Sequence, residues 1–192
     1  DGFTGIDLKD ISTITDFSMG SLTKINNAIN LNIKITNTYP YFNYFKTSDY
    51  FKPQGTVDIS GYDGKLEYLF KGIDLDRLKI ICNEPLTHES GKYMFAFASG
   101  QDVTTLNSLF DYMPNMTDFS YMFYCSSIKN APTIPLRAIN TSYMFYNNAA
   151  MEVTPANWLR QYYFTPISNY CYTGCAGIHT IDSSPGTIDN IP

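Results

Sequence analysis

A tripeptide of the form Tyr-apolar-aromatic recurs five times in the chain. Its copies are Tyr68-Leu69-Phe70, Tyr93-Met94-Phe95, Tyr121-Met122-Phe123, Tyr143-Met144-Phe145 and Tyr170-Cys171-Tyr172. The five tyrosines are 25, 28, 22 and 27 residues apart, and such a period is typical of repeat architectures. A unit of this length cannot bury its own apolar face, so the repeat requires that neighbouring copies stack into a continuous core.

Each copy of the repeat predicts the same order of local structures. Ser120 and Ser142 stand directly before the tyrosine, and serine is a good helix N-cap, so the triplet is expected to open a short helical turn. A break of Gly, Asn or Ser follows, and then an apolar stretch that favours a short strand. Proline closes several units, for example Pro132 and Pro155, which suits a strand end.

The first third of the chain is less regular. Residues 28–35 alternate apolar and polar side chains, a period-two pattern that predicts a half-buried strand. Residues 15–19 echo residues 117–121. We therefore expect degenerate repeats or a cap over 1–65 and regular repeats over 66–192.

The sequence from Ser120 to Leu136, together with residues 141–148, resembles the leucine-rich-repeat variant of BspA-type surface proteins. The resemblance is clearest over residues 93–184, and Cys125 matches the family's cysteine. It implies an α/β repeat solenoid, a leucine-rich-repeat-like stack of short parallel strands with short helical turns. It also implies adhesion or recognition rather than catalysis, since such repeats occur in bacterial surface proteins and in structural proteins of bacteriophage particles.

Composition excludes several classes of partner. The 192 residues include 13 Lys+Arg and 18 Asp+Glu, a formal charge of −5, so the chain has no excess of basic groups for neutralising nucleic-acid phosphates. No stretch approaches the apolar length of a membrane span. The absence of an initiator Met and of a basic-then-apolar leader suggests a fragment of a longer protein.

Catalytic and metal-binding alternatives have weak support in the sequence. A hydrolase would draw on His88 or His179, but neither lies in a recognisable motif. Cys171 and Cys175 with His179 could hold a metal, although Cys171 occupies the core-facing middle position of the triplet. No phosphate-binding loop or other cofactor motif occurs. We therefore expect neither an enzyme nor a cofactor or metal.

The Tyr-apolar-aromatic rows are expected to form the interior of the stack, which leaves the strands as the candidate contact face. The residues eight or nine positions after each tyrosine are predicted to form an exposed row: Asp102, Lys129, Glu152 and His179. The alternative for this row is plain solvation. A second candidate is a segment rich in residue types common at binding hot spots, which could equally be a lid over the core: Trp158, Arg160, Tyr162 and Tyr163.

The leading hypothesis is a non-catalytic recognition or adhesion module of a bacterial surface protein or a bacteriophage virion. It would be extracellular and would bind a protein or a surface glycan through its repeat face. The alternative is a structural subunit domain of a phage particle that contacts only other virion subunits.

Overall fold

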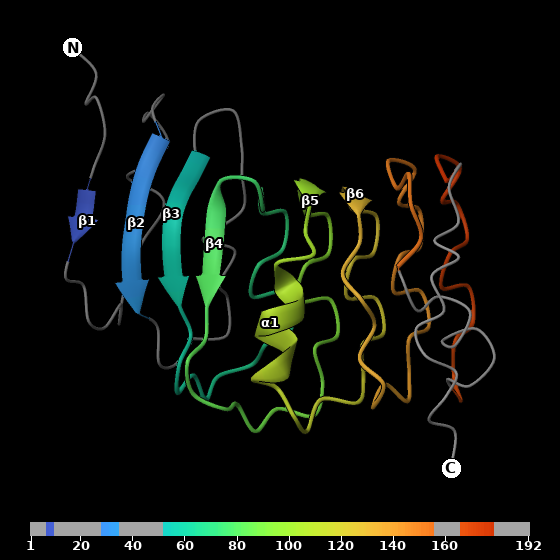
Figure 1. Ribbon diagram of the computed structural model, residues 1–192, viewed down its shortest axis with the longest axis horizontal. Helices are drawn as coiled ribbons and strands as arrows, with labels where there is room; N and C mark the ends of the chain where they lie inside the picture. Colours follow the sequence, from blue (N-terminus) through green and yellow to red (C-terminus); the bar gives the residue numbers. More distant parts are fainter. Residues whose placement is uncertain (1–6, 10–27, 35–51, 156–165, 179–192) are drawn as a thin grey trace.

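The computed structural model describes residues 7–9, 28–34, 52–155 and 166–178, with side chains from residue 54 onward. Successive segments of the chain lie side by side along the long axis (Figure 1). The N-terminal strands are at one end and the last described turn is at the other.

Two parallel sheets contain the strands of the described residues. The first has four strands in chain order, and the second has two. They are β1 (Asp7–Lys9), β2 (Ala28–Lys34), β3 (Lys52–Asp58) and β4 (Leu78–Ile81), then β5 (Ser99–Asp102) and β6 (Ser127–Asn130). The strand expected from the alternation over residues 28–35 is confirmed as β2. The one helix in the described part of the chain, α1 (Leu106–Asp111), is short and follows β5.

The strands pair at equivalent positions of consecutive repeats. Val57 of β3 pairs with Ile80 of β4, and Gly100 of β5 pairs with Ile128 of β6. This register continues past β6, because Asn130 forms a parallel bridge with Val153. The boundary expected between residues 65 and 66 falls in the chain between β3 and β4, and these two strands are hydrogen-bonded neighbours in the same sheet.

The Tyr-apolar-aromatic triplets form chains of β-turns, not the helical turns that the sequence predicted. In the second copy, the N–H groups of Met94, Ala96 and Ala98 each donate to the carbonyl three residues earlier, at 3.0–3.1 Å. The first residue of every triplet has a positive φ, between 56° and 61° in Tyr68, Tyr93, Tyr121, Tyr143 and Tyr170. A right-handed helix needs a negative φ at each residue, so these tyrosines prevent the helix.

The turns are capped three residues before the tyrosine. The side-chain oxygens of Asp118 and Asn140 accept the N–H groups of Ser120 and Ser142, each at 3.0 Å. The serines were expected to cap a helix with their side-chain oxygens, but here they donate their backbone N–H groups. The Asp or Asn two residues earlier accepts that N–H and forms an Asx-type turn.

The core is built from the second and third positions of the triplets. The middle residues are buried, and so are the four phenylalanines of the third position: Phe70, Phe95, Phe123 and Phe145. These rings stack in one row with centroids 5.4–5.6 Å apart. Tyr172 continues the row at 5.6 Å from Phe145.

We expect Phe123→Ala to lower the free energy of unfolding by about 3–5 kcal/mol, because it removes a fully buried ring with a neighbour on each side. Urea unfolding measures the change. Phe97→Ala is the matched control, since Phe97 is 48% exposed and should lose much less. Equal losses in the two variants would contradict a core centred on the phenylalanine row.

Candidate recognition surface

The first residues of the triplets form a second aromatic row, which we call the tyrosine face. Its members are Tyr68, Tyr93, Tyr121, Tyr143 and Tyr170. Consecutive rings are stacked with centroids 4.6–5.1 Å apart. This spacing follows from the parallel pairing of the turns, which are about 4.8 Å apart like strands in a sheet.

The tyrosine face is partly exposed to solvent, which corrects the expectation that all triplet rows lie in the interior. Tyr68 is 37% and Tyr170 is 60% exposed, and the three tyrosines between them are half-buried. Each inner ring has a neighbour on both sides, so the part that it offers to solvent is its edge.

Two lysines and further aromatic side chains border this face. The Lys71 ammonium lies 5.1 Å from the Tyr68 ring centroid and 5.2 Å from that of Phe97. Lys92 lies between Tyr93 and Tyr121, at 5.5 and 5.4 Å. A parallel pair, Tyr124 and Tyr146, is stacked at 5.4 Å beside the row.

A tyrosine at a left-handed position is unusual, because an L side chain there costs about 1–2 kcal/mol. The chain provides an internal comparison four residues further on. That position is also left-handed in every copy, and it holds Gly72, Phe97, Cys125, Asn147 and Gly174. The same backbone conformation accepts glycine there, so the conformation by itself does not require tyrosine at the first position.

Two substitutions distinguish the effect of the left-handed backbone on stability from the effect of the stacked ring. We expect Cys125→Gly to raise the free energy of unfolding by at most about 1 kcal/mol, because it relieves a residue at φ 52°. Tyr121→Gly relieves the same strain but removes a ring stacked on both sides, so it should lower stability. Urea unfolding compares them. A Tyr121→Gly protein as stable as the parent would show that the stack contributes nothing to the fold.

Three tyrosines of the face, and one beside it, have raised phenol pKa values. Burial raises the pKa of Tyr68, Tyr93 and Tyr143 above the ordinary value. A side-chain hydrogen bond with Cys125 raises the pKa of Tyr124. Behind the face, burial raises the pKa of the Cys175 thiol to about 11. At neutral pH these four phenols are therefore uncharged.

These shifts predict that the fold loses stability in alkali. A group whose pKa is higher in the folded than in the unfolded chain stabilises fully below the unfolded value and less as pH rises through the folded value. The contribution of Cys175 to the free energy of unfolding should decline from about pH 9 to about pH 11. The contribution of the tyrosines should decline above about pH 10. Urea midpoints from pH 8 to 11 test this, and Cys175→Ala should remove the earlier part. A flat profile would contradict it.

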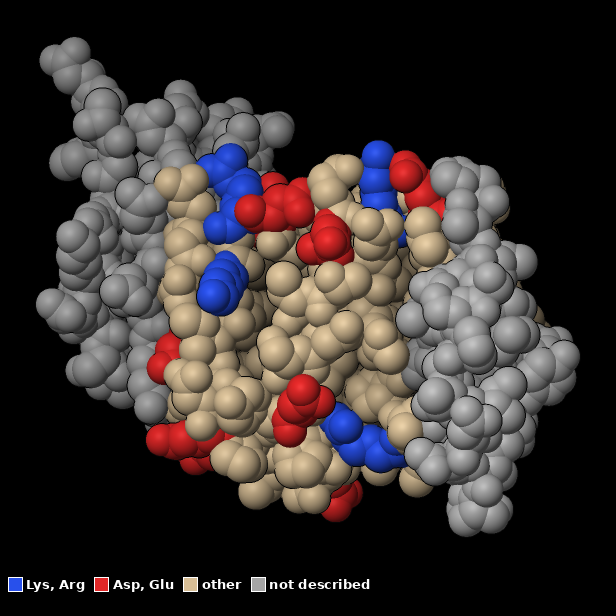
Figure 2. All heavy atoms as spheres, viewed as in Figure 1, with Lys and Arg blue, Asp and Glu red and all other residues tan. Residues whose placement is uncertain are grey.

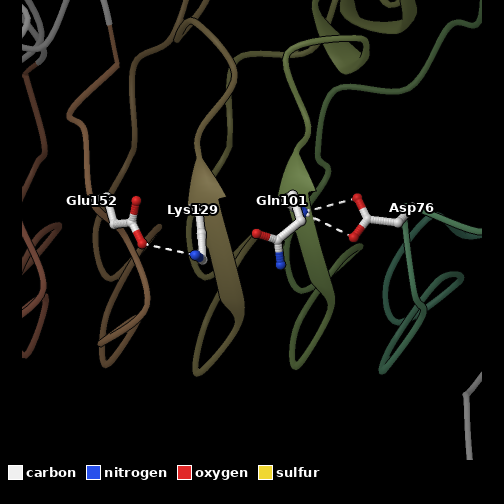
Figure 3. A network of polar contacts seen from close by, with 4 residues as sticks. All are labelled: Asp76, Gln101, Lys129 and Glu152. Carbon is white, nitrogen blue, oxygen red and sulfur yellow. Dashed lines mark hydrogen bonds and ion pairs between the residues drawn. The ribbon is translucent and has the colours of Figure 1, made fainter.

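The strand row predicted from the sequence is partly assembled (Figure 3). The Lys129 ammonium forms an ion pair with Glu152 at 2.9 Å, and both side chains are about 40% exposed. The register places Gln101, not Asp102, beside Lys129. The backbone N–H of Gln101 donates to both carboxylate oxygens of Asp76, at 2.9 and 3.1 Å.

Asp102 lies one position further along β5, opposite Asn130. Its carboxylate accepts the N–H and the hydroxyl of Thr104, at 3.0 and 2.7 Å, and these bonds lower its pKa. It borders a shallow cleft of about 260 Å³ that Asn130, Thr133 and Val153 also line. His179, Trp158, Arg160, Tyr162 and Tyr163 lie outside the described residues.

His88, the other histidine considered for catalysis, makes contacts within the protein. The Nε2–H of His88 donates to the Gly64 carbonyl at 2.6 Å, and its ring stacks on Tyr62 at 5.9 Å. Within the described part of the chain, no cluster of three His, Cys, Asp or Glu side chains is placed to hold a metal ion. Among those residues there is also no helix long and apolar enough to cross a membrane.

Charged groups are sparse on the surface. On the face shown in Figure 2, Lys, Arg, Asp and Glu occur in small groups of both signs with broad uncharged areas between them. The described surface in this view thus has no continuous patch of one charge.

No family model, curated protein or solved structure significantly matches this chain. The likeness to BspA-type repeats therefore rests on the motif residues alone.

The tyrosine face is the surface that sequence reasoning missed. Five aromatic residues at repeat spacing indicated a stacked core, and this holds for the phenylalanine row. The sequence holds one chemical signal that the two aromatic positions differ in exposure. The first position has a hydroxyl group in all five copies, whereas the third position is phenylalanine in four.

Proposed function

We propose that this protein is a non-catalytic recognition module that binds a protein or a glycan through the tyrosine face. The module would be a leucine-rich-repeat-like solenoid of the BspA type, carried outside the cell on a bacterial surface protein or a virion. The observation that carries the proposal is the row of partly exposed, mutually stacked tyrosines at left-handed positions.

The chemistry of this face suits a contact surface. Tyrosine supplies a large amphipathic area with few rotatable bonds, and it is enriched at interfaces for that reason. Stacking already restricts each inner ring, so little side-chain entropy is left to lose on binding. The lysines beside Tyr68 and Tyr93 add charge at one end of the row.

The strand row is the weaker candidate. Lys129 and Glu152 already neutralise each other, and a partner that bound either would have to break their ion pair. The Asp102 carboxylate is likewise occupied by the N–H and the hydroxyl of Thr104.

A binding screen with matched variants tests the proposal. The probes are a glycan array and immobilised host-cell surface proteins. For any ligand retained by the parent protein, Tyr121→Phe and Tyr143→Phe keep the ring stack and should weaken binding by about fivefold per hydroxyl that donates to the ligand.

The control is the double exchange Lys129→Glu with Glu152→Lys, which keeps an ion pair and reverses its direction. It should leave binding unchanged. Loss of binding in this control but not in the tyrosine variants would move the contact to the strand row.

The structural role in a phage particle predicts a different result. A monomer near 21.7 kDa by light scattering that retains a surface ligand supports recognition. A defined oligomer that retains nothing would overturn it in favour of subunit contacts.

A further inference from the structure

A further row of side chains lies at the fifth residue after each tyrosine. Its members are Ile73, Ala98, Ser126, Asn148 and Cys175. All five occupy the same place in their turns, because each N–H donates to the carbonyl three residues earlier, at 3.1–3.3 Å. The row is apolar in the first two copies, whereas the last three hold a hydroxyl, an amide and a thiol. The chemistry of this row thus changes between the second copy and the third.

Two members of this row are polar and deeply buried. Ser126 is 3% exposed and Asn148 is 0% exposed. Among the described residues, no hydrogen-bond partner is found for Ser126 Oγ or for Asn148 Oδ1 and Nδ2. Buried groups of this kind are rarely left unpaired, because the loss of their bonds to water is then not compensated.

Described turns lie on both sides of these two side chains along the stack. The turn that contains Asn148 is joined to the third turn by the Cys125 N–H, which donates to the Tyr146 carbonyl at 2.7 Å. It is joined to the fifth turn by the Asn147 N–H, which donates to the Thr173 carbonyl at 2.8 Å. The third turn has the second turn on its other side. The unpartnered atoms therefore lie between described parts of the chain.

The strand ladder is interrupted beside these side chains. Between the second and third copies, the Ser127 N–H donates to the Ala98 carbonyl at 2.7 Å. The corresponding bond one copy later would run from the Ala149 N–H to the Ser126 carbonyl, and it is not among the hydrogen bonds of the described chain. Backbone groups beside the buried hydroxyl and amide are thus left out of the ladder.

An extra residue in the fourth copy accounts for the interruption. Asn130, nine residues after Tyr121, pairs with Val153, which is ten residues after Tyr143. Residues 148–151 accommodate the extra residue in a turn that is closed by an N–H to carbonyl bond of 3.2 Å. An extra residue of this kind is left unpaired and disrupts the ladder locally, as in a β-bulge.

We propose that an ordered water molecule is bound inside the stack at this point, between Ser126 and Asn148. Water both donates and accepts, which the hydroxyl and the amide require. A buried water makes about three hydrogen bonds to groups that otherwise lack a partner, and these two side chains provide three such atoms. The site is neutral and belongs to the interior, so it does not depend on the tyrosine face.

Water contacts measured by NMR on the ¹⁵N-labelled full chain test the proposal. A nuclear Overhauser cross-peak of the sign given by long-lived internal water should connect the Asn148 side-chain amide to the water signal. It should persist in Ser126→Ala, which removes a hydroxyl whose proton exchange could imitate bound water. The Ala98 backbone amide is the internal control, because its turn has the same hydrogen bond and an apolar side chain, and it should give no such peak.

The ¹⁷O relaxation dispersion of water gives a second readout that hydroxyl proton exchange does not affect. The double variant Ser126→Ala with Asn148→Leu makes the row apolar, as in the first two copies, and should lower the dispersion amplitude. The double exchange Lys129→Glu with Glu152→Lys is the control. It changes the neighbouring strands only at an exposed ion pair and should leave the amplitude unchanged.

Absence of the Asn148 cross-peak in the parent protein would overturn the proposal, and so would an unchanged dispersion in the folded double variant. A scalar coupling across a hydrogen bond from the Asn148 amide to a protein carbonyl would also overturn it, because the partner would then be the protein itself.

Discussion

The backbone hydrogen bonds between consecutive turns are the contacts on which the rest of the structure depends. The N–H of Phe95 donates to the carbonyl of Met122, and the N–H of Phe123 donates to the carbonyl of Met144. Because the pairing is parallel and in register, each side chain lies directly beside its equivalent in the next repeat. Burial or exposure is therefore decided for a whole row, which is why the phenylalanines form one core and the tyrosines one surface.

The tyrosine row balances a backbone cost against ring stacking. A left-handed tyrosine costs about 1–2 kcal/mol, while an aromatic pair gains about 0.5–1.5 kcal/mol beyond the area that it buries. An inner ring such as Tyr121 has two stacked neighbours in the row, so these contacts are of the size needed to offset the strain. Among the described rings, Tyr68 and Tyr170 each have one such neighbour, so stacking within the row offsets less of the backbone cost at its two end positions.

The repeat, its β2 strand and the buried phenylalanine row were predictable from sequence, because they depend on period and alternation. The tyrosine face was not, since periodic patterns assume right-handed or extended backbone, and a left-handed residue turns its side chain away from the expected side. The offset between Asp102 and Lys129 has a different cause. Repeat lengths of 22 to 28 residues make counting from the tyrosine uncertain by one, and a shift of one residue changes the face of a strand.

The two surfaces also differ in what a partner could gain from them. An exposed ion pair such as Lys129 with Glu152 is worth about 0–1 kcal/mol, and a partner that replaced one member would exchange one weak contact for another. The inner tyrosine edges make no such internal bond that must be broken, and stacking on both faces has already limited their motion. Preorganised groups lose less entropy on association. If this protein binds a partner as proposed, a contact at the tyrosine face would therefore gain more free energy than one at the strand row.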